Sequence, residues 1–231
     1  VPIAIGFNLI ATRKGVVADA DADSWAAVFE DTYAGRVTMR PGSALYAALF
    51  YKGMQDAWLN YDGNPEPVEK AFAELRDYIV SRKGVLRKWY NTTTEVQQLV
   101  LGNEVDVAQG LNEGIVPLVL ADPGIAQAVP KEGVMGWTLN YSLIKGGANQ
   151  ANAYQFIDFL LGQESAAASV VRASGNIPTF KDTTSGLTED EVRAYSFPAE
   201  QLQRISWLDV KGVDDTRYAL LDKYSAGLME A

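Results

Sequence analysis

The first half of the chain alternates apolar stretches with segments in which apolar residues recur at helical spacing. Residues 3–12 (IAIGFNLIAT) are a nearly continuous apolar run, which predicts one or two strands. Gly6 within this run indicates a bend or a close backbone approach. Residues 64–84 place acidic residues early and basic residues late, as the helix dipole favours, and predict a helix. The apolar face of this helix consists of Val68, Phe72, Leu75 and Ile79.

The order of strand and helix patterns predicts the fold class. Strands are expected at 36–39, 85–90 and 105–110, and helices at 23–35, 43–54, 92–104 and 111–122. Residues 125–144 are mostly extended, and the chain after them is largely helical, with a capping-box spacing from Thr188 to Glu191. This order predicts an α/β sheet with added helical cover.

Composition and charge exclude several functions. The 231 residues are 48% hydrophobic, which is enough for a real core, and the net charge of −9 leaves no basic stripe for nucleic acid. No run approaches the roughly 20 apolar residues of a membrane span, so membrane insertion is not expected, and the N-terminus lacks a signal-peptide pattern. The acidic turn 19–23 (DADAD) lacks the Gly and distal Glu of a calcium loop. We therefore expect neither metal nor cofactor.

The chain contains no His and no Cys, which argues against an enzyme. Without them a Ser-His-Asp triad, a Cys-His pair or a zinc-thiolate site cannot be built. Chemistry by paired carboxylates or a lysine remains, with Glu113 and Asp209 as candidates, but no acid pair has a spacing that predicts proximity.

Three segments together resemble the extracellular solute-binding proteins of bacterial ABC importers, and most closely the spermidine/putrescine-binding branch. The segments are 24–39 (SWAAVFEDTYAGRVTM), 95–114 (EVQQLVLGNEVDVAQGLNEG) and 129–179, of which the part from Pro130 to Thr179 is the most specific. Each motif alone is a weak signal, whereas their order and spacing along the whole chain are specific.

The resemblance implies a type II periplasmic-binding-protein-like fold, in which two α/β lobes are joined by a hinge of extended crossover strands. Residues 6–126 would form the second lobe, 1–5 and 127–137 the crossovers, and 138–231 the C-terminal, mostly helical part of the first lobe. It also implies a bacterial periplasmic location, ABC permease subunits as partners and a small-molecule ligand in the cleft. We expect a monomer.

The N-terminal part of the first lobe has no counterpart in this sequence. The abrupt apolar start (VPIAIGFN) agrees with its absence, so we expect a fragment or one piece of a split protein, with the missing N-terminal segment of the same protein as a partner. An engineered sensor or scaffold module is a further alternative.

The turn Arg40-Pro41-Gly42-Ser43 is the first candidate binding site. Ser43 could simply cap the helix that follows. Alternatively, a strand-to-helix turn with free N–H groups holds an anion, and Arg40 adds a bidentate fork for a carboxylate. Polyamine binders of the resembled branch are expected to carry acids here. The presence of Arg40 where acids are expected favours a ligand that carries a carboxylate: an amino acid, an ω-amino acid, an opine or a sugar acid.

Trp137 and Asn140 form the second candidate pair. The resemblance places an aromatic residue near 137 and an acid near 140, so Trp137 would stack on the ligand and the neutral Asn140 would replace an ammonium anchor. A buried aromatic on a crossing strand is the alternative for Trp137, and Tyr141 replaces Asn140 if the register slips by one.

The remaining candidates follow from position in the resembled fold. Asn112 and Glu113 occupy a strand-to-helix turn, where Leu111 stands in place of the family's aromatic residue. A solvated carboxylate at the helix start is the favoured alternative for Glu113. For the candidates that follow, packing or surface exposure is at least as consistent with the sequence as ligand contact. The others are Phe7 and Asn8 after the first crossover, Asn176 in SGNIPT, and Trp207 with Asp209 in ISWLD.

Overall fold

The computed structural model describes residues 1–163, 165–179, 182–207 and 215–229. Its strands are β1 (Pro2–Arg13), β2 (Val37–Met39), β3 (Leu86–Trp89), β4 (Val107–Leu111), β5 (Ile125–Ala128), β6 (Val134–Asn140), β7 (Ile177–Pro178) and β8 (Ile205–Trp207). Its α-helices are α1 (Ala26–Phe29), α2 (Pro41–Tyr51), α3 (Asp56–Leu59), α4 (Glu66–Ser81), α5 (Thr93–Leu101), α6 (Asn112–Ala121), α7 (Gln150–Gly162), α8 (Ala166–Ser174), α9 (Glu189–Tyr195), α10 (Ala199–Leu202) and α11 (Asp215–Met229).

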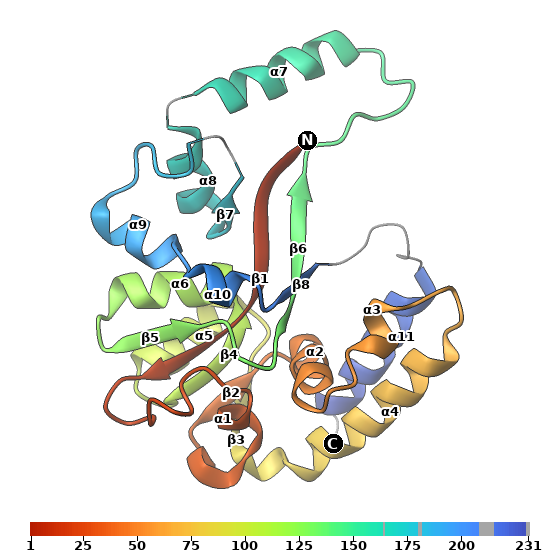
Figure 1. The fold of residues 1–231 in the computed structure, drawn as a ribbon, viewed down its shortest axis with the longest axis vertical. Coiled ribbons are helices and arrows are strands. Elements are labelled where there is room, and N and C mark those ends of the chain that lie inside the picture. Colours follow the sequence, from red (N-terminus) through yellow and green to blue (C-terminus); the bar gives the residue numbers. More distant parts are fainter. Residues whose placement is uncertain (164, 180–181, 208–214, 230–231) are drawn as a thin grey trace.

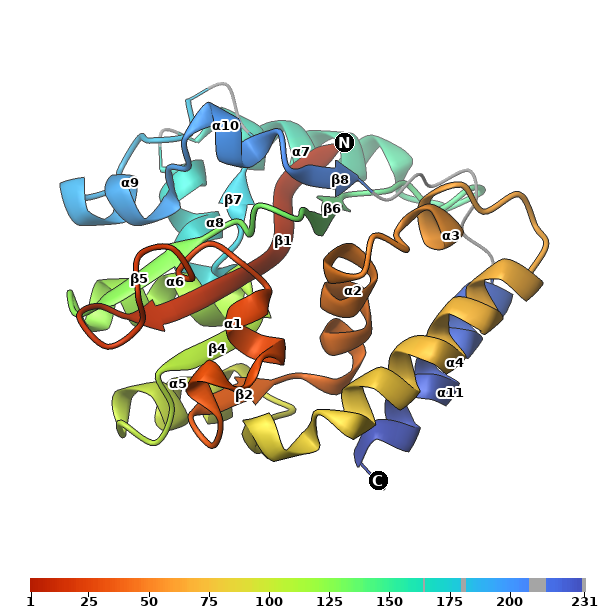
Figure 2. The same cartoon turned by 60° about the horizontal axis from the view of Figure 1, so that its bottom comes forward.

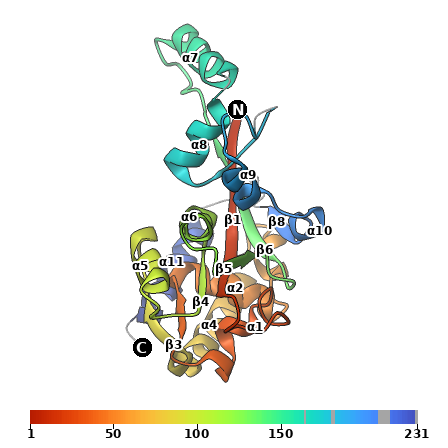
Figure 3. The ribbon, with the colours of Figure 1, turned by 90° about the vertical axis from the view of Figure 1, so that its left-hand side faces the viewer.

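The long strand β1 lies in the interior of one mixed sheet and runs through most of its length (Figure 3). The order is β3-β2-β4-β1-β6-β8, and β5 and β7 also pair with β1. The half of β1 around Leu9 pairs antiparallel with β4, and the half around Phe7 pairs antiparallel with β6. Strands β2–β3, β2–β4 and β6–β8 are parallel. The predicted α/β class is confirmed.

Helices α2, α4 and α11 form one packed group beside the sheet (Figure 1). Figure 2 shows α2 between the sheet and the pair α4–α11, which lie side by side. The buried ring of Trp58 joins this group, because it meets Tyr46 of α2 at 5.1 Å and Tyr218 of α11 at 5.8 Å between ring centroids. Helix α11, which the expected division at residue 138 places in the first lobe, thus packs on α2 and α4. The division itself stays a prediction.

Helix α7 lies apart from the rest of the molecule (Figure 1). None of its residues is buried, its main helix contact is with α8, and the Phe156 ring meets Tyr141 at 6.2 Å between centroids. Tyr154, Phe156 and Phe159 are each more than half exposed. These aromatic side chains are therefore covered only in part within the described residues.

The start of α2 corrects the expectation that Ser43 caps this helix. Arg40 occupies the N-cap position in extended conformation, Pro41 is the first helical residue, and no side chain caps the helix. Proline suits this place because its missing N–H would have no helical partner and its φ is preset. Ser43 is therefore not the cap but a buried residue of the first turn. The capping box from Thr188 to Glu191 is confirmed at α9.

Candidate functional site

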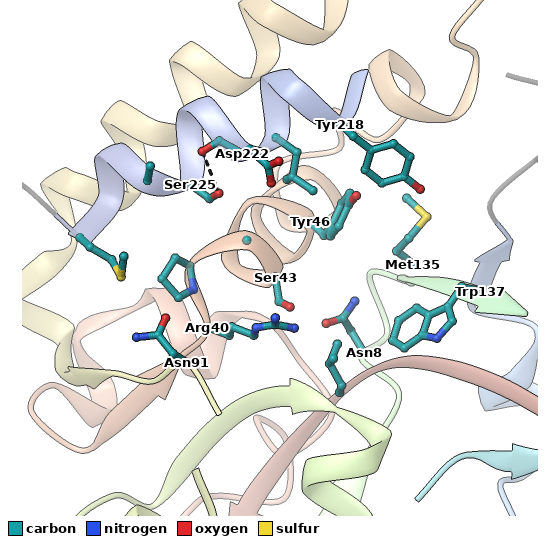
Figure 4. A pocket seen from close by; sticks show the side chains of 16 residues that line it. Asn8, Arg40, Ser43, Tyr46, Asn91, Met135, Trp137, Tyr218, Asp222 and Ser225 are labelled. Carbon is teal, nitrogen blue, oxygen red and sulfur yellow. Dashed lines mark hydrogen bonds between the residues drawn. The ribbon is translucent and has the colours of Figure 1, made fainter. Parts of the chain in front are cut away.

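A cavity of about 540 Å³ lies where α2 and α11 face the sheet (Figure 4). Five of the twelve candidate residues line it: Asn8, Arg40, Gly42, Ser43 and Trp137. They come from β1, from the start of α2 and from β6, so the fold brings together segments that are far apart in the sequence. Their role in ligand binding stays a prediction.

The side-chain amides of Gln109 and Asn8 form a chain of hydrogen bonds beside this cavity. The side-chain oxygen of Gln109 on β4 accepts a hydrogen bond from the backbone N–H of Arg40 at 3.2 Å. The Gln109 side-chain N–H donates to the Asn8 side-chain oxygen at 2.9 Å. Both amides are almost fully buried. Because buried amides are costly to leave unpaired, this chain fixes the backbone of Arg40 and the orientation of Asn8.

The guanidinium of Arg40 is available to a ligand. The side chain is exposed and lines the cavity, and it makes no ion pair with any residue that the structure describes. Burial raises the pKa of the nearby Tyr90 phenol, and the positive charge of Arg40 opposes that rise. The Tyr90 hydroxyl donates to the Gln109 carbonyl at 2.9 Å. The carboxylate of Glu113 adds to the rise in pKa. This phenol therefore stays neutral and does not itself pair with Arg40.

Aromatic residues form another wall of the cavity. Tyr46 of α2, Tyr218 of α11 and Trp137 of β6 all line it (Figure 4). Burial raises the pKa of Tyr46 well above its ordinary value. The indole of Trp137 lies against Gly6, where an added Cβ would be 2.5 Å from two ring atoms. The close approach predicted at Gly6 is confirmed, and its cause is this indole.

Two candidate residues belong to the core instead. Phe7 is fully buried and meets Phe197 edge to face at 5.2 Å between centroids, so it does not reach the cavity as expected. Asn112 is also fully buried. Its oxygen accepts from the Phe7 N–H at 3.0 Å, and its amide donates to the carbonyl of Gly175 at 2.8 Å. Asn112 therefore holds β1 to the end of α8, because its hydrogen-bonding capacity is used within the protein.

Glu113 and Asn176 line a different cavity, of about 690 Å³, beside α8 and α9. Asn140 is exposed and its amide donates to Thr138, two residues away. Trp207 is 45% exposed, and Asp209 lies outside the described residues. Glu113, Asn176, Asn140 and Trp207 therefore do not line the cavity that Arg40 lines.

Sequence reasoning missed the side of the cavity that α11 supplies. Tyr218, Asp222, Ser225 and Met229 line it, at spacings of four, three and four residues along the helix. This spacing places them on one helix face. The same spacing was readable in the sequence, but only the fold shows that α11 packs beside α2. Within the described residues, no group of acidic side chains is arranged to hold a metal, and no helix is long and apolar enough to cross a membrane.

Comparison with known proteins identifies a family. The profile of the family described as bacterial extracellular solute-binding protein matches residues 1–196. A putrescine/agmatine-binding protein of Pseudomonas aeruginosa is 26% identical over 175 residues, which cover 69% of this chain and 44% of that protein. This chain thus matches less than half the length of that relative.

Two solved structures share the fold. One is a spermidine/putrescine ABC transporter substrate-binding protein of Streptococcus pneumoniae, with a TM-score of 0.75 and 17% identity over 100% of this chain and 68% of that one. The other is the PBP AgtB of A. tumefaciens R10 in complex with agropinic acid, with a TM-score of 0.67 and 21% identity over 99% of this chain and 69% of that one. The expected periplasmic-binding-protein-like fold is confirmed. These relatives are named as binding proteins, in agreement with the expectation that the chain is not an enzyme.

Proposed function

Because the chain belongs to the family of bacterial extracellular solute-binding proteins, we propose that it is the solute-binding component of an ABC importer. It acts in the periplasm as a monomer and delivers its ligand to the permease subunits. The ligand is small and polar, carries a carboxylate and occupies the cavity between α2, α11 and the sheet. It is an amino acid, an ω-amino acid, an opine or a sugar acid.

One observation carries the carboxylate assignment: the guanidinium of Arg40 faces this cavity without an ion pair among the described residues. A planar guanidinium donates two parallel hydrogen bonds to a carboxylate, which gives both affinity and orientation. The buried amide chain through Gln109 fixes its backbone. Asn8 and Ser43 add neutral polar groups beside it, and Trp137 adds an apolar wall.

The proposed mechanism is hinge closure over the ligand. Strand β1 pairs with β4 on one side of the hinge and with β6 and β7 on the other. A ligand that contacts both sides stabilises the closed state by its higher affinity for that state. Exclusion of water on closure strengthens the bond between Arg40 and the carboxylate.

The test is a thermal-shift screen followed by calorimetry on the best ligand. The screen contains amino acids, ω-amino acids, opines, sugar acids and polyamines. Arg40→Gln should weaken binding of the best carboxylate by about 10- to 100-fold, as expected for loss of a charge-assisted hydrogen bond. Arg87→Gln is the matched control, because Arg87 pairs with Glu104 on the surface. Unchanged affinity in Arg40→Gln would remove the basis of the carboxylate assignment.

Polyamine binding is the second candidate function. It is supported by the name of the Pseudomonas aeruginosa relative and by the aromatic wall of Tyr46, Tyr218 and Trp137, which suits ammonium groups. Under this alternative putrescine or spermidine gives the largest thermal shift, and Arg40→Gln strengthens binding because a repelling cation is removed. The two candidates thus predict opposite signs for one variant.

The exposed aromatic side chains of α7 support a proposal about a further partner. The Streptococcus pneumoniae structure extends beyond the 68% of its length that this chain covers. We propose that an N-terminal segment of the same protein packs on Tyr154, Phe156 and Phe159, because large apolar patches on soluble proteins are usually covered. Intact-mass measurement of the protein from its source tests this. A mass of 25.1 kDa, that of this sequence alone, would contradict it.

A further inference from the structure

A second charged residue lines the cavity, and the resemblance to solute-binding proteins did not indicate it. Among the described residues that line it, two are charged, and these are Arg40 at the start of α2 and Asp222 on α11. Figure 4 shows them on different walls, with Ser43 and Tyr46 between them. Asp222 makes no ion pair with a described residue, so its carboxylate, like the guanidinium of Arg40, has no charged partner there.

Helix α11 presents Asp222 to the cavity for a structural reason. The helix packs on α2 and α4, and its face with Tyr218, Asp222 and Ser225 turns toward α2. The hydroxyl of Ser225 donates to the Asp222 carbonyl at 3.2 Å, within the helix, and leaves the carboxylate unused. The negative charge acts on the cavity lining, since it contributes to raising the pKa of the Tyr46 phenol, after burial and Tyr218 and against the larger opposing effect of Arg217.

From this arrangement we infer that the site selects a zwitterion, whose carboxylate meets Arg40 and whose ammonium group meets Asp222. This inference rests on the proposed function and narrows its ligand class. If the ligand were an acid without an amine, the Asp222 carboxylate would have no cation to pair with. If it were a diamine, one ammonium group would lie against the like charge of Arg40. The Arg40 and Asp222 side chains are both exposed in this structure. Once closure of the cleft removes water from them, an unpaired charge is costly, so a ligand with one charge of each sign fits best. The aromatic rings of Tyr46 and Tyr218 lie beside the ammonium end and favour a cation there.

The experiment compares unbranched probes of equal length by isothermal titration calorimetry. Each set contains an ω-amino acid, the dicarboxylate, the diamine and the monocarboxylate, with chains of three to six carbons. The variants are Asp222→Asn and Asp222→Lys. Asp158→Asn on the exposed helix α7 is the matched control, because Asp158 is exposed and lines none of the cavities described here.

We expect the wild type to bind the best ω-amino acid at least about 10-fold more tightly than the other three probes of that length, as expected for one additional paired charge. The Asp222→Asn variant should no longer bind the ω-amino acid more tightly than the monocarboxylate. The Asp222→Lys variant should bind the dicarboxylate best. Asp158→Asn should behave as the wild type. Circular dichroism and melting curves of the four proteins verify that each is folded.

The outcomes separate the inference from the proposed function. If a dicarboxylate or monocarboxylate binds best, or if Asp222→Asn leaves the probe preference unchanged, the zwitterion inference is wrong while the carboxylate assignment stands. If the diamine binds best, or if no carboxylate-bearing probe binds, both are wrong.

Discussion

Replacement of Asn112 tests whether this residue holds β1 to the end of α8, as its hydrogen bonds to Phe7 and Gly175 indicate. In Asn112→Ala the Phe7 N–H loses its acceptor in a site where both residues are fully buried. An unsatisfied buried donor costs about 1–3 kcal/mol, and the lost bond to the Gly175 carbonyl adds about 0.5–1.5 kcal/mol. The free energy of unfolding should therefore fall by about 2–4 kcal/mol.

Urea denaturation followed by tryptophan fluorescence measures this loss, and thermal melting provides a second readout. For a protein of this size each kcal/mol lowers Tm by about 2–4 °C, so the variant should melt about 5–15 °C lower. Asn152→Ala is the matched control, because Asn152 is exposed on α7. It should change stability by less than about 0.5 kcal/mol.

Asn112→Asp separates the acceptor role from the donor role. The carboxylate still accepts from the Phe7 N–H but faces the Gly175 carbonyl, which is also an acceptor. Burial beside this oxygen raises the pKa of the new carboxyl, so the protonated form is favoured in the folded state. The variant should therefore be much less stable than the wild type at pH 7 and recover part of the difference near pH 4. A loss below 0.5 kcal/mol in Asn112→Ala would refute the reasoning.

Two further predictions concern α9 and β1. Arg172 above all holds the pKa of Glu191 down at about 2, so the stability from this carboxylate is present above its unfolded pKa and is lost as pH falls from about 4.5 to 2. Glu191→Gln should cost about 1–2 kcal/mol at pH 7, given the half-exposed arginine, and much less at pH 2, where the carboxylate is half protonated in the folded state; urea denaturation measures both costs. An equal cost at the two pH values would contradict this. Gly6→Ala should cost about 1–3 kcal/mol through the clash with Trp137. In the same assay the cost should shrink in a Trp137→Leu background; an unchanged cost would show that the indole is not the cause.

The regular elements were predictable from local patterns. The periodic face from Val68 to Ile79 became α4, and the capping box at Thr188 became the start of α9. These signals are local because a helix is specified by spacing and by its own ends. The start of α2 was missed by a few residues, since Pro41 and the backbone of Arg40 begin the helix without a side-chain cap.

Part of the lining of the candidate site was predictable, most clearly at one local turn, and Asn8 and Trp137 were also among the candidates. Arg40, Gly42 and Ser43 lie together at the end of β2, and this junction was recognised. Asn112 has the same strand-to-helix context, yet its amide is consumed by Phe7 and Gly175. Whether a polar side chain faces a ligand or the protein depends on partners that are distant in sequence, and local pattern does not contain them.

Under the proposed function, the placement of Arg40 and Asp222 sets the stage of binding at which the charges of the ligand are selected. Arg40 belongs to α2 and Asp222 to α11, and these helices pack directly on each other. Trp58 stabilises that packing through ring contacts with Tyr46 and Tyr218. The separation between the guanidinium and the carboxylate is thus set by helix packing rather than by hinge closure, whereas Trp137 comes from the crossing strand β6. Substitution of either charged residue should then weaken the initial encounter with the ligand, and substitution of Trp137 should mainly speed its release.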